Sequence, residues 1–279
     1  MNTNDLENYL RLIGEGRRNE AEEIREKSIP NSLIKHIGFD GSETDELKLT
    51  TLENNELWFS NVSEFNDPYE FKGMVINRRA FQDAGYPDEV IDKFNNFLEM
   101  KEFGVACLSA VDIDYLPMWA YYTNNYQGYV IEFDVLDKRL IHQVIYEPNR
   151  IPIAKTLLYP LSKVMEADKL GVRPSFDCDK SSMLLMQNLV IKGRSWEHEK
   201  EYRIVWDINQ QKGMNLKLSD LGLKVRRIIA GINCCKEHLE RLNSISNKIG
   251  CGNIYISYLS ETKYGLEIKE YDSSIQNVN

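Results

Sequence analysis

Hydrophobic residues along the chain fall into short blocks with either helical or extended spacing. Apolar positions three or four residues apart predict helices over residues 4–28, 44–54, 87–100, 116–123, 181–192 and 235–249. Blocks rich in β-branched and aromatic residues predict strands over residues 32–39, 56–61, 103–109, 128–134, 202–206, 225–232, 253–260 and 263–271. The last two strands are expected to pair as a terminal hairpin.

The order of these blocks indicates a mixed α+β fold. No internal repeat, low-complexity run or obvious linker divides the chain. We therefore expect a helical N-terminal extension over residues 1–30 and a single α+β domain over residues 31–279. A division in mid-chain would separate the candidate site residues discussed below.

Composition and charge narrow the class of protein. Of 279 residues, 42% are hydrophobic and 28% are charged, which excludes a disordered, collagenous or fibrous chain. The formal net charge is -9, so a nucleic-acid partner would need a local basic patch. The first residues carry charges where a signal peptide needs an apolar run, and no stretch approaches the roughly 20 apolar residues of a membrane span. We expect a cytoplasmic protein with no membrane partner.

Several common kinds of site are not expected. Five cysteines, an odd number that includes one adjacent pair and no C-x-x-C spacing, argue against a disulfide framework and a structural zinc ion. His198 has no second histidine at helical spacing, so an H-E-x-x-H metal site is absent. The chain also lacks G-x-G-x-x-G, Walker and G-x-S-x-G motifs, which removes the common dinucleotide fold, nucleotide hydrolases and α/β-hydrolases.

The strongest chemical signal is the segment Glu199-Lys200-Glu201-Tyr202-Arg203. In an extended chain, Glu199 and Glu201 stand on the same face, about 7 Å apart. Two such carboxylates repel each other, which raises the pKa of one and disfavours the arrangement unless something uses it. A ribose diol, a metal ion or an oxocarbenium-like centre would be such a user. A solvated strand end, with Lys200 and Arg203 neutralising the acids, explains the same residues equally well.

A second candidate is the loop that follows the strand over residues 56–61. Asn66 and Asp67 stand directly before a proline, in a turn that projects polar side chains at a strand end, where sites often lie. An Asx-turn explains both residues without any function, and we favour that interpretation by a small margin.

A third candidate is the aromatic cluster at the helix over residues 116–123. Trp119, Tyr121 and Tyr122 are close enough along the helix to stack on a nicotinamide or adenine ring. Aromatic clusters of this kind are more often part of the core. His36 is likewise alone in an apolar strand, where a histidine is usually a satisfied core or edge residue.

Several segments together resemble a bacterial family of unknown function, family 2971. They are, in chain order, LWFSNVSEFNDPYEF, CLS, MWAYYTNNYQGYVIEFD and WEHEKEYRIV. The resemblance covers about residues 33–272 and leaves the N-terminal helix outside it. The FNDP and EKEYR motifs carry most of it, and they imply a fold more than a function.

A more distant resemblance concerns the segment KEYRIVWD. It is similar to the last strand of ADP-ribosyltransferases of the poly-ADP-ribose polymerase type, whose leading glutamate is catalytic. The resemblance implies a mainly antiparallel, split sheet with flanking helices. It also implies that Glu201 is the catalytic glutamate, and that Glu199 completes the E-x-E of the bacterial-toxin branch.

The same resemblance implies residues that bind NAD, which is the substrate. His36 or Lys35 on the first strand would take the place of the ribose-binding histidine or arginine. Ser109, or Cys107 beside it, would lie near the nicotinamide ribose. With the candidates above, the expected NAD-binding set is His36, Lys35, Ser109, Tyr121, Tyr122, Asn66, Asp67 and Arg203.

The chemistry of this reaction fits a pair of glutamates. Cleaving the nicotinamide bond generates an oxocarbenium-like ribose, which a carboxylate hydrogen-bonded to the 2′-OH stabilises. A second glutamate can orient or deprotonate the acceptor. We therefore expect an NAD-dependent ADP-ribosyltransferase that modifies a protein or a nucleic acid (RNA or DNA), as a toxin or an anti-phage effector. Such an enzyme would need an inhibitor partner, either an antitoxin or a chaperone protein.

Two other functions remain open. A metal-dependent nuclease would use Asp67, Glu199 and Glu201 as metal ligands. It ranks second because Lys200 lies between the two acids, whereas an E-x-K nuclease holds its lysine two positions after an acid. The third hypothesis is a non-catalytic binding or sensor domain. The sequence does not identify the acceptor or the oligomeric state.

Overall fold

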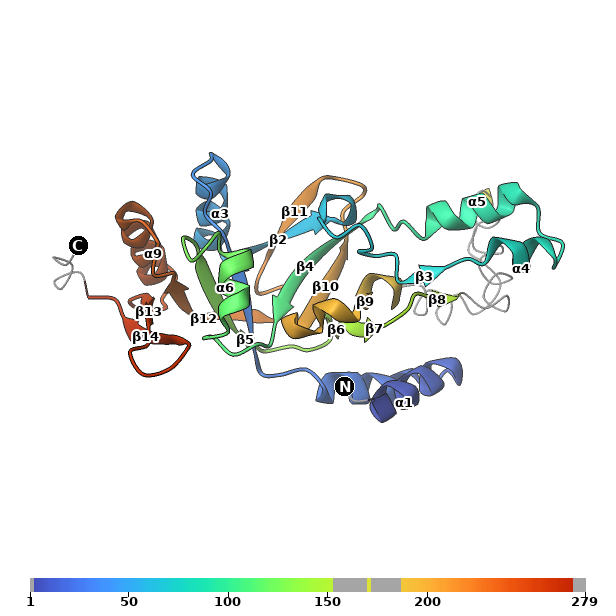
Figure 1. The fold of residues 1–279 in the computed structure, drawn as a ribbon, viewed down its shortest axis with the longest axis horizontal. Coiled ribbons are helices and arrows are strands. Elements are labelled where there is room, and N and C mark those ends of the chain that lie inside the picture. Colours follow the sequence, from blue (N-terminus) through green and yellow to red (C-terminus); the bar gives the residue numbers. More distant parts are fainter. Residues whose placement is uncertain (1–2, 153–169, 172–186, 273–279) are drawn as a thin grey trace.

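The computed structural model describes residues 3–152, 170–171 and 187–272 (Figure 1). Within these ranges, ten strands form one sheet: β1 (Ser32–Ile37), β2 (Glu56–Asn61), β4 (Phe103–Ser109), β5 (Tyr129–Val135), β6 (Ile141–Gln143), β10 (Glu201–Asp207), β11 (Gly213–Lys217), β12 (Leu223–Ala230), β13 (Tyr255–Leu259) and β14 (Leu266–Glu270). The main path of the sheet is β11-β2-β4-β1-β5-β12-β13-β14. β10 pairs with β4 and β6 outside this path.

Strand pairing in this sheet is mainly antiparallel. The exception within the described sheet is β12 with β13, which run parallel. Two short parallel pairs lie outside it: β3 (Met74–Val75) with β8 (Ile151–Pro152), and β7 (Ile145–Glu147) with β9 (Ile191–Gly193). The prediction of a mixed α+β fold with a mainly antiparallel sheet and flanking helices is therefore confirmed.

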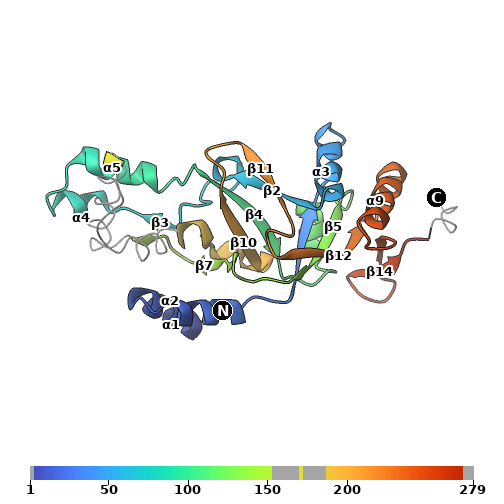
Figure 2. The same cartoon turned by 180° about the vertical axis from the view of Figure 1, so that it is seen from behind.

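The helices flank the sheet, and some of them lie at the two ends of the molecule. They are α1 (Thr3–Gly14), α2 (Arg18–Lys27), α3 (Thr44–Glu53), α4 (Arg78–Gln82), α5 (Asp88–Phe97), α6 (Leu116–Tyr122) and α9 (Lys236–Lys248). Three 3-10 helices accompany them: η1 (Val62–Glu64), η3 (Gln187–Val190) and η4 (Arg194–Glu199). α4 and α5 lie at one end of the molecule, and α9 with the β13–β14 hairpin lies at the other (Figures 1 and 2).

The central strands and α9 form where the sequence pattern is strongest. β5 lies between β1 and β12, and its YVIEFDV segment buries five of its seven residues. α9 buries Leu239, Leu242 and Ile245 on one face, and Gly250 follows it with a φ of 80°. A left-handed residue just past a helix end is a site that glycine favours. The predicted hairpin of the last two strands is also confirmed.

Two predicted helices differ from the structure. The block over residues 4–28 forms two helices because the chain reverses near Gly16, where φ is 76°. Of the predicted helix over residues 181–192, residues 181–186 lie outside the described residues, and residues 187–192 form η3 and part of β9. Residues 191 and 192 are extended because β9 pairs with β7, a strand that is distant in sequence. The division into residues 1–30 and 31–279 stays a prediction.

Arg25 anchors the N-terminal helices to the sheet. Its side chain is 2% exposed, and its guanidinium donates to the main-chain oxygens of Lys138, Arg139 and Ile141 beside β6. Glu22 pairs with the same guanidinium at 2.6 Å. A buried charge held by carbonyl groups and one carboxylate is costly to lose, because its partners then stay unsatisfied.

We expect Arg25→Met to lower the free energy of unfolding by about 3 kcal/mol, since three main-chain oxygens, one of them buried, lose their donor. Limited proteolysis should then cut between α2 and β1 faster than in the wild-type protein. Arg17→Met removes an exposed arginine just before the same helix and is the matched control. Equal urea midpoints for both variants would show that Arg25 is not the anchor.

Candidate functional site

Three strands meet at Ser109, the last residue of β4. Ser109 is the Cα partner of Ile34 on β1 and of Glu201 on β10. Within the described sheet, β1 pairs with β4 at this one position, whereas β10 pairs with β4 along its whole length. The end of β4 and the start of β10 therefore lie next to β1 at Ser109. In the described sheet β1 and β4 are not paired beyond this point.

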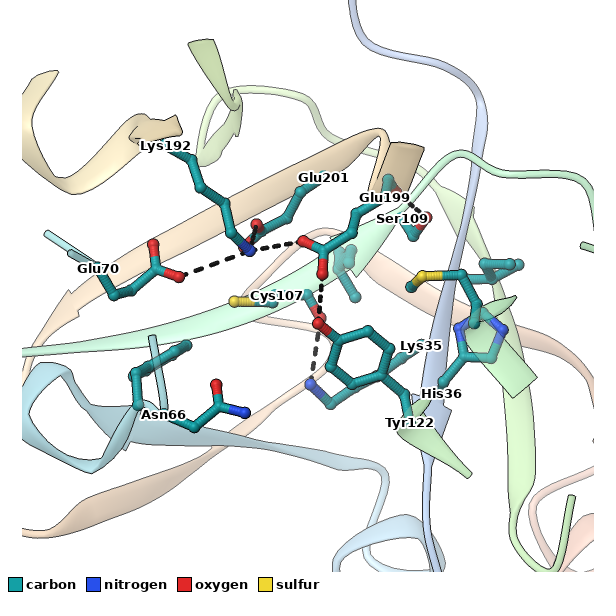
Figure 3. A pocket seen from close by; sticks show the side chains of 14 residues that line it. Lys35, His36, Asn66, Glu70, Cys107, Ser109, Tyr122, Lys192, Glu199 and Glu201 are labelled. Carbon is teal, nitrogen blue, oxygen red and sulfur yellow. Dashed lines mark hydrogen bonds and ion pairs between the residues drawn. The ribbon is translucent and has the colours of Figure 1, made fainter. Parts of the chain in front are cut away.

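A cavity of about 140 Å³ opens beside this junction (Figure 3). Lys35 and His36 of β1, Cys107 and Ser109 of β4, and Tyr122 at the end of α6 all line it. An apolar cavity of about 150 Å³ binds benzene in another protein. The cavity is therefore large enough for one six-membered ring, and a larger ligand would extend beyond it.

Lys192 of β9 holds three glutamates together at the cavity wall (Figure 3). Its Nζ lies 2.5 Å from Glu199 Oε2, 2.9 Å from Glu201 Oε2 and 3.5 Å from Glu70 Oε2. Burial lowers the pKa of Lys192, but attraction to Glu201 and Glu70 outweighs it and raises the pKa overall. The lysine is therefore charged, and it separates carboxylates that would otherwise repel one another.

Arg203 is the second buried cation of this cluster. Its guanidinium donates to Glu201 Oε1 at 2.7 Å, to Glu70 Oε1 at 2.6 Å and to the Leu189 main-chain oxygen at 2.6 Å. The side chain is 0% exposed and also lies over the ring of Phe71. Arg203 does not line the cavity, and its role in binding NAD stays a prediction.

The two glutamates of the EKE segment do not lie on one extended strand. Glu199 ends η4, Lys200 has a left-handed φ of 44°, and Glu201 begins β10. The expectation that both glutamates stand on one face of an extended strand was therefore wrong, because the chain turns at Lys200. Both carboxylates nevertheless line the cavity, since Lys192 draws them together.

Glu199 keeps more acceptor capacity than Glu201. A carboxylate accepts about four hydrogen bonds. Glu201 receives three from the cations around it, one from Lys192 and two from Arg203. Glu199 receives one from Lys192 and one from the hydroxyl of Tyr122. Glu199 is thus the carboxylate better able to bind a ligand in the cavity, and Glu201 is the better anchored one.

Carboxylates and cations lie side by side in the cluster. Burial opposes ionisation of Glu201, but Arg203 and then Lys192 overcome it and lower its pKa to about 2. Lys35 adds a third basic side chain at the wall of the cavity. Burial raises the pKa of the Tyr122 hydroxyl, and its bond to Glu199 raises it further, so the phenol stays neutral and donates. Glu199, which accepts from one cation and one neutral phenol, is therefore the carboxylate best placed to face a positively charged ligand.

Lys35 and Cys107 face each other across the gap between β1 and β4. The Lys35 ammonium donates to the Cys107 main-chain oxygen at 3.1 Å, and burial lowers its pKa. Burial, and then the charge of Glu201, raise the pKa of the Cys107 thiol well above its usual value. The thiol is thus protonated and a poor nucleophile at neutral pH.

His36 lines the cavity without a hydrogen-bond partner in the described structure. Both ring nitrogens are buried and unpaired, and the ring meets Trp119 edge-on at 5.8 Å. Burial, and then repulsion from Lys35, lower the pKa of His36 to about 3. Buried polar atoms are nearly always hydrogen-bonded, so an unpaired imidazole at a cavity wall indicates a place for a ligand.

The neutral state of His36 predicts a loss of stability in acid. Its pKa is near 6.5 in the unfolded chain and about 3 in the folded one. Between these values the unfolded state binds more protons, so stability falls by up to about 1.4 kcal/mol for each unit that the pH drops. In His36→Phe, unfolding free energies measured from pH 7 to pH 4 should fall less steeply. An unchanged slope would mean that His36 is protonated in the folded protein.

The other predicted site residues divide between the cavity and its surroundings. Asn66 lines the cavity. Asp67 does not: its Oδ1 accepts from the main-chain N–H of Tyr69 at 2.9 Å, the Asx-turn that we favoured. Tyr121 is 69% exposed and does not line the cavity either, so its role in binding a ring stays a prediction. Trp119 is fully buried and belongs to the core.

Sequence reasoning missed two residues, Lys192 and Glu70. Lys192 ends an apolar run, and a lysine buried there requires an acidic partner, which was an available signal. Glu70 lies in the predicted loop motif but three residues beyond the turn that we selected. Its position depends on Arg203 and Lys192, which come from distant strands.

The nuclease hypothesis stays a prediction. Asp67 does not line the first cavity with Glu199 and Glu201, and Lys192 binds both of these carboxylates. In the part of the chain that the structure describes, no group of three or more His, Cys, Asp and Glu side chains is placed to hold a metal ion. None of the described helices is long and apolar enough to cross a membrane.

Comparison with known proteins supports the first resemblance in part. Residues 118–204 match the family described as protein of unknown function (DUF2971). That region contains α6, β5, β9, η4 and the start of β10, and thus Tyr122, Lys192, Glu199 and Glu201. Neither the curated proteins nor the solved structures contain a match to the chain.

Proposed function

We propose that the protein is an NAD-dependent ADP-ribosyltransferase that modifies a macromolecule. One observation carries the proposal: the three segments that the resemblance assigns to NAD chemistry are neighbours at one cavity. These segments are β1 with His36, β4 with Ser109, and the start of β10 with Glu201. They are far apart in the sequence, and the sheet brings them together at Ser109.

The charge and size of the cavity suit the reactive part of NAD. The nicotinamide ring of NAD carries a positive charge, and positive charge develops on the ribose as the glycosidic bond breaks. A carboxylate close to the ring and the ribose stabilises both states, and more strongly in a site from which water is excluded. A volume of about 140 Å³ accepts one ring, which leaves the adenine end of the molecule outside.

The residues at the wall support distinct steps of this reaction. The bond from ribose C1′ to the nicotinamide nitrogen breaks, and its electron pair leaves with nicotinamide, which becomes neutral. Glu199 has free acceptor capacity to bind a ribose hydroxyl and stabilise the oxocarbenium-like centre. The acceptor then forms a bond to C1′ and releases its proton to a carboxylate. The unpaired nitrogens of His36 are available to bind the ligand.

The test is incubation of the purified full-length chain with NAD labelled in its adenylate part, together with cell extract. We expect release of nicotinamide and transfer of label to a macromolecule, which separate protease and nuclease digestions then classify. A folded protein that neither cleaves nor binds NAD would overturn the proposal in favour of a non-catalytic binding domain. Cleavage of nucleic acid that needs Mg²⁺ and ignores NAD would restore the nuclease.

We propose further that the enzyme acts as a toxin or an anti-phage effector, held in check by an antitoxin or a chaperone protein. The support is chemical, since transfer of ADP-ribose to an essential macromolecule is harmful to the cell that makes the enzyme. Induced production of the wild-type chain in a bacterial host should therefore arrest growth, whereas Glu199→Gln should not. Equal growth with both chains would contradict this role and leave the enzymatic proposal untouched.

A further inference from the structure

A second cavity lies on the other side of Lys192. Its volume is about 360 Å³, within the range of small-molecule sites, and it is larger than the first. Lys192 lines both cavities, and its ammonium, which binds Glu199 and Glu201, also lies 5.1 Å from the centre of the Trp196 ring. Lys192 is thus a shared wall residue of the candidate NAD cavity and of a second space large enough for a substrate.

The wall of the second cavity combines aromatic rings with cations. Trp196 is half-buried in η4, and Tyr69 is 65% exposed in the loop before β3. Lys72 and Arg150 add positive charge beside them. The Arg150 guanidinium is held in place because it donates to the main-chain oxygens of Lys72 at 2.6 Å and of Met74 at 3.0 Å.

We propose that this second cavity is the acceptor site, and that it holds an unpaired base of a single-stranded nucleic acid. The inference rests on the proposed ADP-ribosyltransferase activity. Aromatic faces beside Lys and Arg are the combination by which proteins bind single strands, since bases stack on the rings and phosphates meet the cations. The carboxylate of Asp67, which also lines the cavity, is able to accept from an exocyclic amino group of a base.

The position of the cavity fits transfer to such a base. A nucleophilic nitrogen or oxygen of the base attacks C1′ of the NAD ribose as the bond to nicotinamide breaks. The base loses one proton to Glu199 or to water, and nicotinamide leaves with the electron pair of the broken bond. The net charge of -9 disfavours tight binding along the length of a nucleic-acid strand. A site that holds one base beside two or three cations does not require such binding.

The test measures transfer of labelled ADP-ribose from NAD to short single-stranded RNA and DNA oligonucleotides. We expect labelled oligonucleotide with the wild-type chain, and a KM for the oligonucleotide about tenfold higher in Trp196→Ala, since stacking on one aromatic ring is lost. Trp196→Phe should restore most of the affinity. Tyr69→Ala should also raise the KM, and it keeps the test valid if Trp196→Ala does not fold. Trp58→Ala removes an exposed tryptophan of β2 that lines neither cavity and is the control.

The outcomes separate this inference from the function on which it rests. Cleavage of NAD with label only on protein would overturn the nucleic-acid acceptor and keep the transferase. Labelled oligonucleotide with equal KM values for all variants would overturn the second cavity as the acceptor site. If the wild-type chain does not cleave NAD, the proposed function fails. In that case, fluorescence anisotropy of a labelled oligonucleotide tests whether the second cavity binds single strands. Binding that does not depend on Trp196 and Tyr69 would overturn the second cavity as the binding site.

Discussion

Replacing Glu199 with glutamine is expected to lower the rate of nicotinamide release from NAD by about 100-fold or more. The substitution preserves size, and the hydroxyl of Tyr122 can still donate to the amide oxygen. Lys192 keeps Glu70 and Glu201 as partners. What disappears is a negative charge beside the place where positive charge develops, so kcat should fall much more than KM rises.

The matched control for this variant is Glu197→Gln. Glu197 lies in the same 3-10 helix but is exposed and lines neither cavity, so its loss should leave the rate unchanged. Glu201→Gln gives the comparison within the cluster. Full activity of Glu199→Gln together with loss in Glu201→Gln would assign the catalytic role to Glu201, as the sequence resemblance implies. Wild-type rates in both would exclude this cavity as the place of NAD cleavage.

Lys192→Met is expected to destabilise the protein by about 3–5 kcal/mol at pH 7, because it leaves buried carboxylates without one of their two cations. The sign of the pH dependence follows from Glu201, whose pKa of about 2 lies below its ordinary 4.5. The stabilisation that Glu201 gains from its cations is present above pH 4.5 and is lost as the pH falls towards 2. The difference in unfolding free energy between the wild-type chain and Lys192→Met should therefore become smaller as the pH falls.

Urea unfolding of both chains at pH 7 and at pH 4 checks this prediction. Lys217→Met is the control, because Lys217 forms an exposed pair with Glu56 that contributes little. A deficit that stays constant with pH would mean that the lysine stabilises the fold by packing alone. Lys192→Met that unfolds like the wild-type chain at both pH values would show that the carboxylates share a proton and do not need the lysine.

The sequence was sufficient where local pattern and tertiary burial agree. The predicted ends of β2 and β4 match the structure because both strands have turns on either side and apolar residues within. Glu199, Glu201, His36, Lys35, Ser109, Tyr122 and Asn66 all line one cavity, as the combined motifs led us to expect. Their shared position follows from the order of the strands in the sheet, which residue spacing alone does not give.

The remaining features depend on contacts between distant parts of the chain. At Ile191 and Lys192 the apolar pattern has no period that separates a buried helix from a buried strand, and the pairing of β9 with β7 decides for the strand there. Arg203 was expected to bind NAD because a cation suits its pyrophosphate, whereas in the structure its guanidinium donates to Glu70 and to the Leu189 main-chain oxygen. A sequence shows which side chains are charged and does not show which of them the fold removes from solvent.

The junction at Ser109 also has a consequence for synthesis of the protein on the ribosome. β1 and β4 leave the exit tunnel early, whereas Lys192, Glu199 and Glu201 follow in the last third of the chain. Domains fold as their residues become available, and pairing between distant strands is slow. A nascent chain therefore exposes the unfinished cavity without Lys192, Glu199 and Glu201, and an inhibitor protein could meet the chain at this stage, before the acidic cluster forms.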